Sequence, residues 1–550
     1  MNKKTVLAIV AVIVAILIVS AAVLLLSGPP PKAKYQLELW YSTGHYGDTE
    51  DELATVLQSS IEACGKVDVT LRSDIWDVYV DRWSAGDYPL FLLGWYPDYF
   101  DTDDYISPFL STAGAESLGS FYSNATMDQW IQDEQSATTT ALRADRFTKI
   151  QDQLAEDVPY VPLISGNAHV AYVSSVSNVI LHPVSFKWFI IDKAGATELN
   201  ASTTDHISSL DPAKAYDYFS IEVINQVFDT LLVYEPATAA LMPGLATSMP
   251  TVSSDGLNYT FTVRNGIQFH DGTELNASVV KRSIERLIRL DLASSAAFLY
   301  YDTGALGNTP NITVSPNDRD ITFHLQRPVA FFPDLMAFSP SAPVPWDYNQ
   351  TGEQSSTAGN VVGSGPYRLT NHVADTLIEL QSDPNYYKSN LYAGFNIPTI
   401  PVEDKVTINI RQTATALKQD IETKAVDVVY RTLDPLDITD LDSRETALGI
   451  KVDVGASPQI RYLVFNVETV TDVRVRQAIA YSVDRAAIDQ TVFSGIVEPL
   501  YSMVPANMPY QSPVFQDRYG GSPDCGEANV LFAELGYSIR GATIWIARDI

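Results

Sequence analysis

The pattern that most constrains this chain is an alternation of strands and helices in its first hundred residues. Tyr35–Tyr41 alternates apolar and polar residues, as a half-buried strand does. Thr49–Cys64 is predicted to be a helix, Val67–Leu71 a strand and Trp76–Ala85 a helix, and another strand begins near Phe91. Strands that alternate with helices predict an α/β fold built on a sheet.

The stretch Phe91–Phe109 (FLLGWYPDYFDTDDYISPF) is the first candidate site. Its apolar start predicts a buried strand, which Pro97 ends because proline cannot donate to a sheet. A loop rich in carboxylates and aromatic rings follows, and ligands of α/β sheets bind beyond the carboxyl ends of strands. A carboxylate there can hold an ammonium group between aromatic walls. The alternative is a capped helix start, with Asp101 or Asp103 as the N-cap, and different aspartates could serve each purpose.

Size and charge exclude several classes of protein. The 550 residues are too many for one ordinary core, so we expect at least two lobes. The formal charge of −30, from 36 basic and 66 acidic residues, argues against nucleic acid as a partner. Neither a CxxC motif nor a Cys/His cluster is present in the sequence, which argues against a zinc or iron–sulfur site.

The N-terminal residues Thr5–Leu26 are apolar or small and carry no charge. At roughly 1.5 Å per residue a helix of this length reaches about 33 Å, enough to cross a bilayer. Lys3 and Lys4 precede it, so we expect a single-pass anchor with everything after Ser27 outside the cytoplasm. A cleaved signal peptide is the alternative. Gly28–Pro31 is predicted to be a stiff spacer.

The remaining elements continue the α/β pattern, and a run of small polar residues at Lys193–Thr204 is predicted to be a linker or surface loop. A hairpin is expected from Tyr259–Val263 and Gly266–His270. The other predicted helices are Arg143–Glu156, Ile221–Val233, Ala277–Arg289, Ala414–Lys424, Val473–Ser482, Arg485–Phe493 and Ala528–Leu535. The other predicted strands are Val161–Ile164, His169–Val173, Ile321–Leu325, Thr376–Leu380, Val406–Ile410 and Tyr462–Val467.

Residues Tyr259–Arg286 (YTFTVRNGIQFHDGTELNASVVKRSIER) carry a specific resemblance. They are similar to the signature Phe-x-Leu-Arg-x-Gly-x-x-Phe-His-Asp-Gly of family 5 solute-binding proteins, the extracytoplasmic peptide-binding components of ABC transporters. Val263 replaces the leucine. Further stretches that resemble the family are Gly363–Tyr367, Asp383–Tyr387, Val475–Ile479 with Asp484-Arg485, and Asp157–Leu163.

The order of these stretches departs from the family. There the signature lies near the start and a Gly-Trp-x-x-Asp loop near the end, whereas here the loop, at Gly94–Asp98, comes first. The chain resembles a circular permutation, and the alternative is that a gene rearrangement or an assembly artefact joined two neighbouring copies. The resemblance implies a two-lobed periplasmic-binding-protein-like (type II) α/β fold with an extra subdomain, after the anchor and spacer at residues 1–34. One lobe would combine 35–169 with 457–550, the other would be 170–456, and crossovers near 169 and 456 would form the hinge.

The resemblance also implies a ligand site. In the family the aspartate of the Gly-Trp-x-x-Asp loop pairs with the α-ammonium of the ligand, and Gly94, Trp95 and Asp98 match that motif. We therefore expect Asp98 to bind ligand, with Trp95, Tyr96 and Tyr99 supplying a dry surrounding. Trp40 and Tyr41 end the preceding strand at the same kind of edge, although core packing is the preferred interpretation of Trp40. His45 is expected to face solvent.

Cys64 and Cys525 would lie on neighbouring elements of one lobe in the family's order, and an outward-facing protein favours a disulfide between them. Two buried free thiols are the alternative. His270 and Asp271 are predicted to be turn residues and not catalytic groups, because Gly272 follows them.

The resemblance therefore predicts a monomeric binding protein, without cofactor, that captures peptides and delivers them to an ABC permease. Nickel chelates, haem or oligosaccharides are further ligands known in the family. A hydrolase that uses paired carboxylates among Asp98, Asp101, Asp103 and Asp104 is a competing hypothesis, as is a sensor ectodomain or a non-functional rearranged copy.

Overall fold

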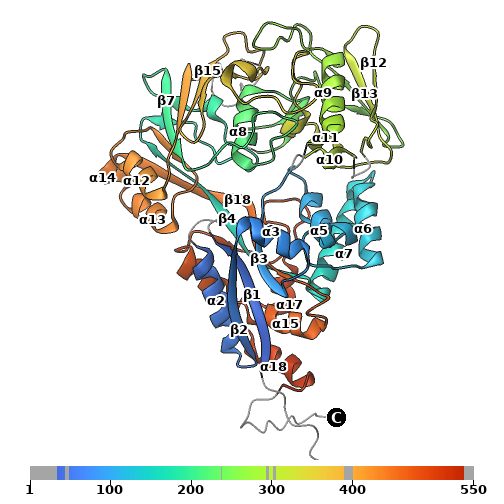
Figure 1. The fold of residues 1–550 in the computed structure, drawn as a ribbon, viewed down its shortest axis with the longest axis vertical. Helices are drawn as coiled ribbons and strands as arrows, with labels where there is room; N and C mark the ends of the chain where they lie inside the picture. Colours follow the sequence, from blue (N-terminus) through green and yellow to red (C-terminus); the bar gives the residue numbers. More distant parts are fainter. Residues whose placement is uncertain are drawn as a thin grey trace, which may run out of the picture.

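One mixed sheet runs through the whole molecule in the computed structural model, which describes residues 34–43, 49–236, 238–292, 296–301, 305–388 and 400–537 (Figure 1). Its strands, in spatial order, are Tyr367–Val373 (β14), Leu377–Ser382 (β15), Lys405–Ile410 (β16), Glu198–Thr203 (β7), Val428–Tyr430 (β17), Tyr160–Val173 (β4), Ile450–Phe465 (β18), Leu90–Trp95 (β3), Tyr35–Thr43 (β1) and Val67–Ile75 (β2), with Glu498–Pro499 (β19) paired to β4.

The two long strands β4 and β18 connect the two ends of this sheet. They pair antiparallel from Ile450 opposite Val173 to Val464 opposite Tyr160. The register shifts between Ala456 and Ile460, which marks a bulge at the middle of the pair. Figure 1 shows both strands crossing from the lower to the upper part of the molecule.

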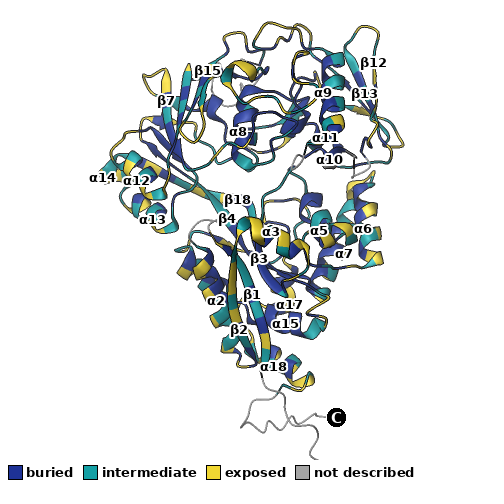
Figure 2. Ribbon diagram, viewed as in Figure 1, coloured by how far each residue is buried: buried dark blue, intermediate teal, exposed yellow. Residues whose placement is uncertain are grey.

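Within the described residues, the buried apolar side chains form three cores, one on one side of this bulge and two on the other. The first core takes residues between Leu37 and Ile164 and between Ile460 and Phe532, and we call the part around it the lower body. The second core lies between Val170 and Val452, and the third between Ala213 and Phe338 with Tyr99 added. The part around these two cores is the upper body. The central strands β3 and β17 are mostly buried, whereas exposed positions lie on helices, on loops and on the edge strand β2 (Figure 2).

Helices flank β3, β1 and β2 in the lower body. The parallel pairing of β1 with both β2 and β3 requires crossover connections, which α2 and α3 provide. The helices are Glu50–Ala63 (α2), Trp76–Ser84 (α3), Thr102–Tyr105 (η1, a short 3-10 helix), Ser107–Leu110 (α4), Thr112–Ser117 (α5), Ala125–Gln135 (α6), Thr140–Asp157 (α7), Val473–Ser482 (α15), Arg485–Ala487 (α16) with a π turn at Ile488–Val492, Val514–Tyr519 (α17) and Cys525–Glu534 (α18).

In the ranges that the structure describes, the upper body adds three small sheets to the main one. They pair Thr251–Val252 (β10), Asn258–Thr262 (β11), Asp320–His324 (β13) and Asn311–Val314 (β12) in that order, Val176–Ser177 (β5) with Asp192–Lys193 (β6), and Leu232–Tyr234 (β8) with Leu241–Pro243 (β9). Its helices are Trp188–Ile190 (η2), Tyr218–Val227 (α8), Ala277–Leu290 (α9), Phe298–Tyr301 (α10), Phe332–Leu335 (α11), Ser339–Ser341 (η3), Ala358–Asn360 (η4), Ala414–Glu422 (α12), Pro435–Ser443 (α13) and Glu445–Leu448 (α14).

Three expectations about local structure are wrong. The expected linker at Lys193–Thr204 contains β7, a strand in the middle of the main sheet. The helix expected at Ile221–Val233 ends at Val227, and its last residues enter β8. Gly266–His270 is not the hairpin partner of β11, which pairs with β13 instead. In each case pairing with another strand overrides the local pattern, and that strand is distant in sequence for β7 and β11 but nearby for β8.

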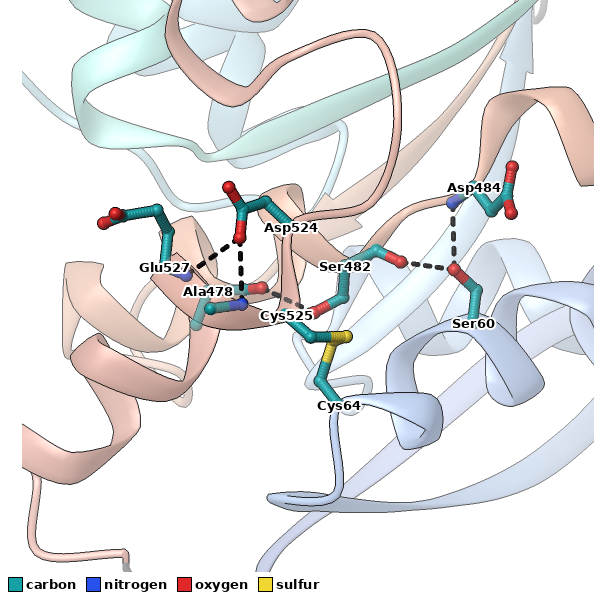
Figure 3. The surroundings of a disulfide bond; sticks show 9 residues. Ser60, Cys64, Ala478, Ser482, Asp484, Asp524, Cys525 and Glu527 are labelled. Atoms are coloured by element: carbon teal, nitrogen blue, oxygen red, sulfur yellow. Dashed lines mark hydrogen bonds between the residues drawn. A yellow bond between two sulfur atoms is a disulfide. The ribbon is translucent and has the colours of Figure 1, made fainter. Parts of the chain in front are cut away.

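A disulfide joins the two chain-end segments of the lower body. Cys64, just after α2, is bonded to Cys525 at the start of α18, with their Cα atoms 4.9 Å apart (Figure 3). Asp484 N donates to Ser60 Oγ on the same side of α2, at 2.9 Å. The ring of Tyr35 lies 6.3 Å from that of Phe532, so β1 packs against α18. Residues 461 positions apart in sequence are therefore neighbours.

Several expectations fall on residues outside the described ranges. These are the anchor Thr5–Leu26, the spacer Gly28–Pro31, His45 and the last residues, 538–550, of the predicted lobe segment 457–550. Within the described part of the chain, none of the helices has both the length and the apolar character that crossing a membrane requires.

Candidate functional site

A cavity of about 1370 Å³ lies between the upper and lower bodies, beside the bulge in the long strand pair. The lower body contributes Gly94, Trp95 and Tyr96 from the end of β3, and the middle of β4 contributes Gly166–His169. The upper body contributes Thr204–His206, which follow β7, and Tyr430–Leu433 at the end of β17. Since β7 and β17 run parallel, their carboxyl ends meet at this edge, as in other α/β ligand sites.

The lower wall of the cavity rests on a buried strand. Leu90–Leu93 of β3 are buried, and β3 is paired with β18 on one side and β1 on the other. Gly94 and Trp95 still pair with Arg461 and Ile460. Pro97 follows, and the chain turns into the acidic loop. The strand β3 therefore ends at the cavity, because the residues before Gly94 are buried in the sheet and Pro97 after it cannot donate to a sheet.

The upper wall is made of aromatic rings around Arg431, which forms an ion pair with Asp205. The Arg431 Nε atom lies 3.0 Å from Asp205 Oδ2, and the guanidinium lies 3.9 Å from the centre of the Tyr218 ring. The hydroxyls of Tyr218 and Tyr430 are 3.0 Å apart. Arg431 and Thr432 have φ angles of 58° and 61°, a left-handed conformation that is strained for a β-branched residue such as Thr432.

The four aspartates of the loop after β3 have different partners. Asp101 caps η1 by accepting from Asp103 N, and its carboxylate binds the guanidinium of Arg143. Asp103 accepts from Tyr99 Oη at 2.6 Å and from Gln135 Nε2 at 2.9 Å.

Asp104 accepts from the Trp95 indole at 3.1 Å and from Asp98 N at 2.9 Å. Asp98 accepts from Tyr216 Oη, which comes from the upper body, at 2.7 Å. Within the described residues, Asp98 is the one of these four aspartates that accepts a side-chain hydrogen bond from the upper body.

Burial shapes the electrostatics of this loop. It raises the pKa of Asp98 to about 7, against the hydrogen bond from Tyr216, which lowers it. Burial, and then the charge of Asp98, raise the pKa of Asp104 well above its ordinary value. Because the two carboxyl groups repel each other's charge, they resist being ionised together.

The structure divides the predicted site residues into two sets. Gly94, Trp95 and Tyr96 line the cavity. The described cavity lining does not include Asp98, Tyr99, Tyr41 or Trp40. Asp98 follows the lining segment by two residues.

The rings of Tyr99 and Trp40 have packing partners outside the cavity. The ring of Tyr99 stacks on Phe331 of the third core, with centroids 4.8 Å apart. The ring of Trp40 stacks on Tyr88 at 4.5 Å, which agrees with the preferred expectation of core packing. Tyr41 is half-buried in β1.

Sequence reasoning missed the upper-wall residues Asp205, Tyr218 and Arg431. The signal that was available is the one used for Gly94–Asp98, namely polar residues directly after a short buried strand. Val428–Tyr430 is such a strand, and Arg431 follows it. The strand before Asp205 was hidden because Glu198–Thr203 is rich in small polar residues.

The family-like motif Phe269–Gly272 lies at a second, smaller cavity of about 250 Å³ in the upper body. His270 Nε2 lies 3.0 Å from the Gly365 carbonyl, and Asp271 Oδ1 accepts from Thr273 N at 2.8 Å. These contacts are those of turn residues that join two motifs. Three or more His, Cys, Asp or Glu side chains gathered to hold a metal ion are not found in the described part of the chain.

The described geometry can be compared with known proteins. The model of the bacterial extracellular solute-binding proteins, family 5 (middle), matches residues 25–117 and 240–546, well over half of the chain. The chain belongs to this family. Its mixed α/β architecture, with two bodies around a cavity, is that of a periplasmic-binding-protein-like fold.

Among curated relatives, the glutathione-binding protein GsiB of Escherichia coli (strain K12) is 27% identical over 365 residues, and that of Salmonella typhimurium is 26% identical over 364 residues. Each match covers 64% of this family 5 chain and 64% of the relative, so the matched part is less than two thirds of the relatives' length.

Two solved structures are similar to parts of the chain. The periplasmic murein tripeptide-binding protein MppA of Escherichia coli aligns with a TM-score of 0.46 and 20% identity, over 63% of this chain and 67% of that one. CtaP of Listeria monocytogenes aligns with a TM-score of 0.48 and 18% identity, over 62% and 66%.

Proposed function

We propose that this protein captures peptides outside the cytoplasm and delivers them to the permease of an ABC transporter. Membership in the extracellular solute-binding family supports this proposal, as does the name of the GsiB relatives, which bind glutathione, a small peptide. The cavity of about 1370 Å³ is large enough for a peptide of a few residues.

The observation that carries the proposal is the position of Asp98. It is a half-buried carboxylate directly beyond the cavity wall Gly94–Tyr96, and its Oδ2 accepts from Tyr216. Asp101, Asp103 and Asp104 are held by Arg143, Tyr99 and Trp95 respectively, which leaves Asp98 as the carboxylate of this loop best suited to a ligand ammonium. The same contacts argue against paired catalytic carboxylates in this loop and favour a binding protein over a hydrolase.

The two bodies are the proposed ligand-holding lobes, with the first lobe formed by 35–169 and 457–550 and the second by 170–456. The crossing of β4 and β18 between separate cores supports a hinge near residues 169 and 456. The apolar run Thr5–Leu26 supports a single-pass anchor that keeps the protein at the outer face of the cell membrane. We propose that the protein acts as a monomer.

Titration calorimetry of the full-length protein with trialanine, with and without N-acetylation, tests this proposal. We expect Asp98→Asn to weaken trialanine binding by about 2 kcal/mol, because a neutral amide then faces the ammonium. N-acetyl-trialanine should bind the unaltered protein more weakly by a similar amount, and the variant should discriminate little between the two peptides. Equal affinity of both peptides for the unaltered protein would refute the role of Asp98.

A further inference from the structure

Tyr216 reaches Asp98 from the opposite body. It precedes Asp217, the N-cap of α8 in the upper body, whereas Asp98 follows β3 in the lower body. Tyr216 Oη donates to Asp98 Oδ2 at 2.7 Å, so this hydrogen bond exists only while the two bodies are together. Tyr216 holds Oδ2 of Asp98, and Oδ1 is the second oxygen of that carboxylate.

Other residues of the same loop also cross between the bodies. The Tyr96 ring lies 4.4 Å from that of Tyr218, and Phe100 N donates to Tyr234 Oη at 3.2 Å. Tyr99 packs within the third core. The loop that carries Asp98 therefore forms a contact between the bodies in addition to the strand pair β4 and β18.

We infer that Tyr216 is a positioning residue that couples ligand capture to the approach of the two bodies, by holding one oxygen of Asp98 while a ligand ammonium binds the other. This inference rests on the proposed function. All the site residues predicted from the sequence were expected in the lower body, whereas Tyr216 belongs to the upper body.

The physical basis is the charge of Asp98. A cationic ligand on Oδ1 keeps the carboxyl ionised, and a hydrogen bond from a hydroxyl to an ionised carboxylate is about twice as strong as one to a neutral group. Binding therefore strengthens the contact that Tyr216 makes between the bodies. A ligand shifts a conformational equilibrium only through such a difference in contacts between the two states.

The titratable groups around Asp98 are few in the described part of the chain. Tyr216 faces it from the upper body and Asp104 from its own loop, while Asp103 acts on Asp104. The hydrogen bond from Tyr216 lowers the pKa of Asp98 and burial raises it. Removing the Tyr216 hydroxyl should therefore raise the pKa of Asp98 further.

The first test needs no ligand. The carboxyl carbon of Asp98 is titrated by NMR in full-length protein labelled with ¹³C-aspartate, and Asp98→Asn assigns its signal. We expect Tyr216→Phe to move the titration of Asp98 to higher pH. Tyr234→Phe is the matched control, because Tyr234 also spans the bodies but bonds Phe100 N and Asp334, and it should leave the titration of Asp98 in place. An Asp98 titration that is the same with and without the Tyr216 hydroxyl would overturn the inference.

The second test uses trialanine as the probe, with calorimetry over pH 5.5–9. Tyr216→Phe should weaken binding roughly tenfold, as expected for a lost hydrogen bond to a charged group, and should shift the pH midpoint of binding upward. In the Asp98→Asn background the same change should have little further effect. Additive losses with an unmoved midpoint would show a merely structural tyrosine and overturn the coupling. If trialanine fails to bind the unaltered protein, the proposed function is at fault, and the ligand-free titration still decides on Tyr216.

Discussion

At the scale of single residues, the aspartates that follow β3 differ in the side chains that they bind. The sequence predicted that the aspartates after β3 would divide between capping and binding, and Asp101 is indeed the N-cap of η1. It could not predict which aspartate meets Arg143 or Tyr216, because those partners lie 42 and 118 positions away. Partners so distant in sequence are set by the packing of elements and leave no local signal.

Glu222 on α8 allows a sharp test at this scale. It is fully buried, accepts from the Trp188 indole at 3.0 Å, and burial raises its pKa to about 7. The folded state therefore holds its proton more tightly than the unfolded state does. Its contribution to stability is fully present below the unfolded pKa and is lost as the pH rises through 7.

We expect Glu222→Gln, which stays neutral, to raise the free energy of unfolding by about 2–3 kcal/mol at pH 8.5 and to change it little at pH 4.5. Urea denaturation at both pH values measures this. Glu285→Gln, at the surface of α9, is the control and should alter stability by less than about 0.5 kcal/mol at either pH. A loss of stability at pH 8.5 in Glu222→Gln would mean that the ionised carboxylate is stabilising.

At the scale of elements, the long strands β4 and β18 show where sequence patterns fail. Val161–Ile164 and His169–Val173 were predicted as separate strands, and they are two parts of β4. The intervening residues are small and polar, which interrupts the apolar pattern. These residues still belong to the strand because they pair with β18 and β19. By contrast, α15 was predicted at its observed bounds, and the predicted bounds of α9 and β16 each differ by one residue at one end, because the periodicity of these elements is strong and local.

His169 ties this strand to the upper wall of the cavity. Its Nε2 accepts from Leu433 N at 3.1 Å, and its Nδ1 lies 3.3 Å from Asn167 Oδ1. Burial, and then the charge of Arg431, lower its pKa to about 4. The unfolded chain, with an imidazole pKa near 6.5, therefore binds more protons between about pH 4 and 6.5, so acid removes stability across that window.

We expect the unaltered protein to lose about 2–3 kcal/mol of unfolding free energy through His169 between pH 7 and pH 4. His169→Gln keeps an acceptor for Leu433 N but does not titrate, so its stability should fall less over the same range. Chemical denaturation at half-unit pH steps gives both curves. Curves of equal slope would show that His169 is as accessible to protons in the folded state as in the unfolded chain.

At the scale of the whole molecule, the sequence predicted an α/β sheet and a family, and both are confirmed. The family resemblance placed Cys64 and Cys525 on neighbouring elements of one lobe, and the structure joins them in a disulfide while β1 packs against α18. What it could not give is the contact of the Asp98 loop with the upper body. Such contacts depend on the distance between the two bodies, and no sequence pattern within one element indicates that distance.

The packing of the lower body leads to a prediction about chain order. Tyr35 and Tyr537 have ring centroids 5.8 Å apart, and Lys66 Nζ donates to the Tyr537 carbonyl at 2.9 Å. A short linker from Tyr537 to Lys34 can therefore restore the order that the family resemblance implies. New ends can be opened in the turn at Gly195, between β6 and β7, which is exposed and has room around it.

We expect this reordered chain to keep the Cys64–Cys525 disulfide and the affinity for trialanine, because both depend on where strands end and not on where the chain starts. It should refold faster, since the lower body no longer has to assemble across the whole upper body and the mean sequence separation of its contacts falls. Stopped-flow refolding of both chains, with the disulfide formed, measures the difference. Opening the chain at Gly195 without joining Tyr537 to Lys34 separates the effect of the cut from that of the order. Slower refolding of the reordered chain would show that the present order is the one its folding route requires.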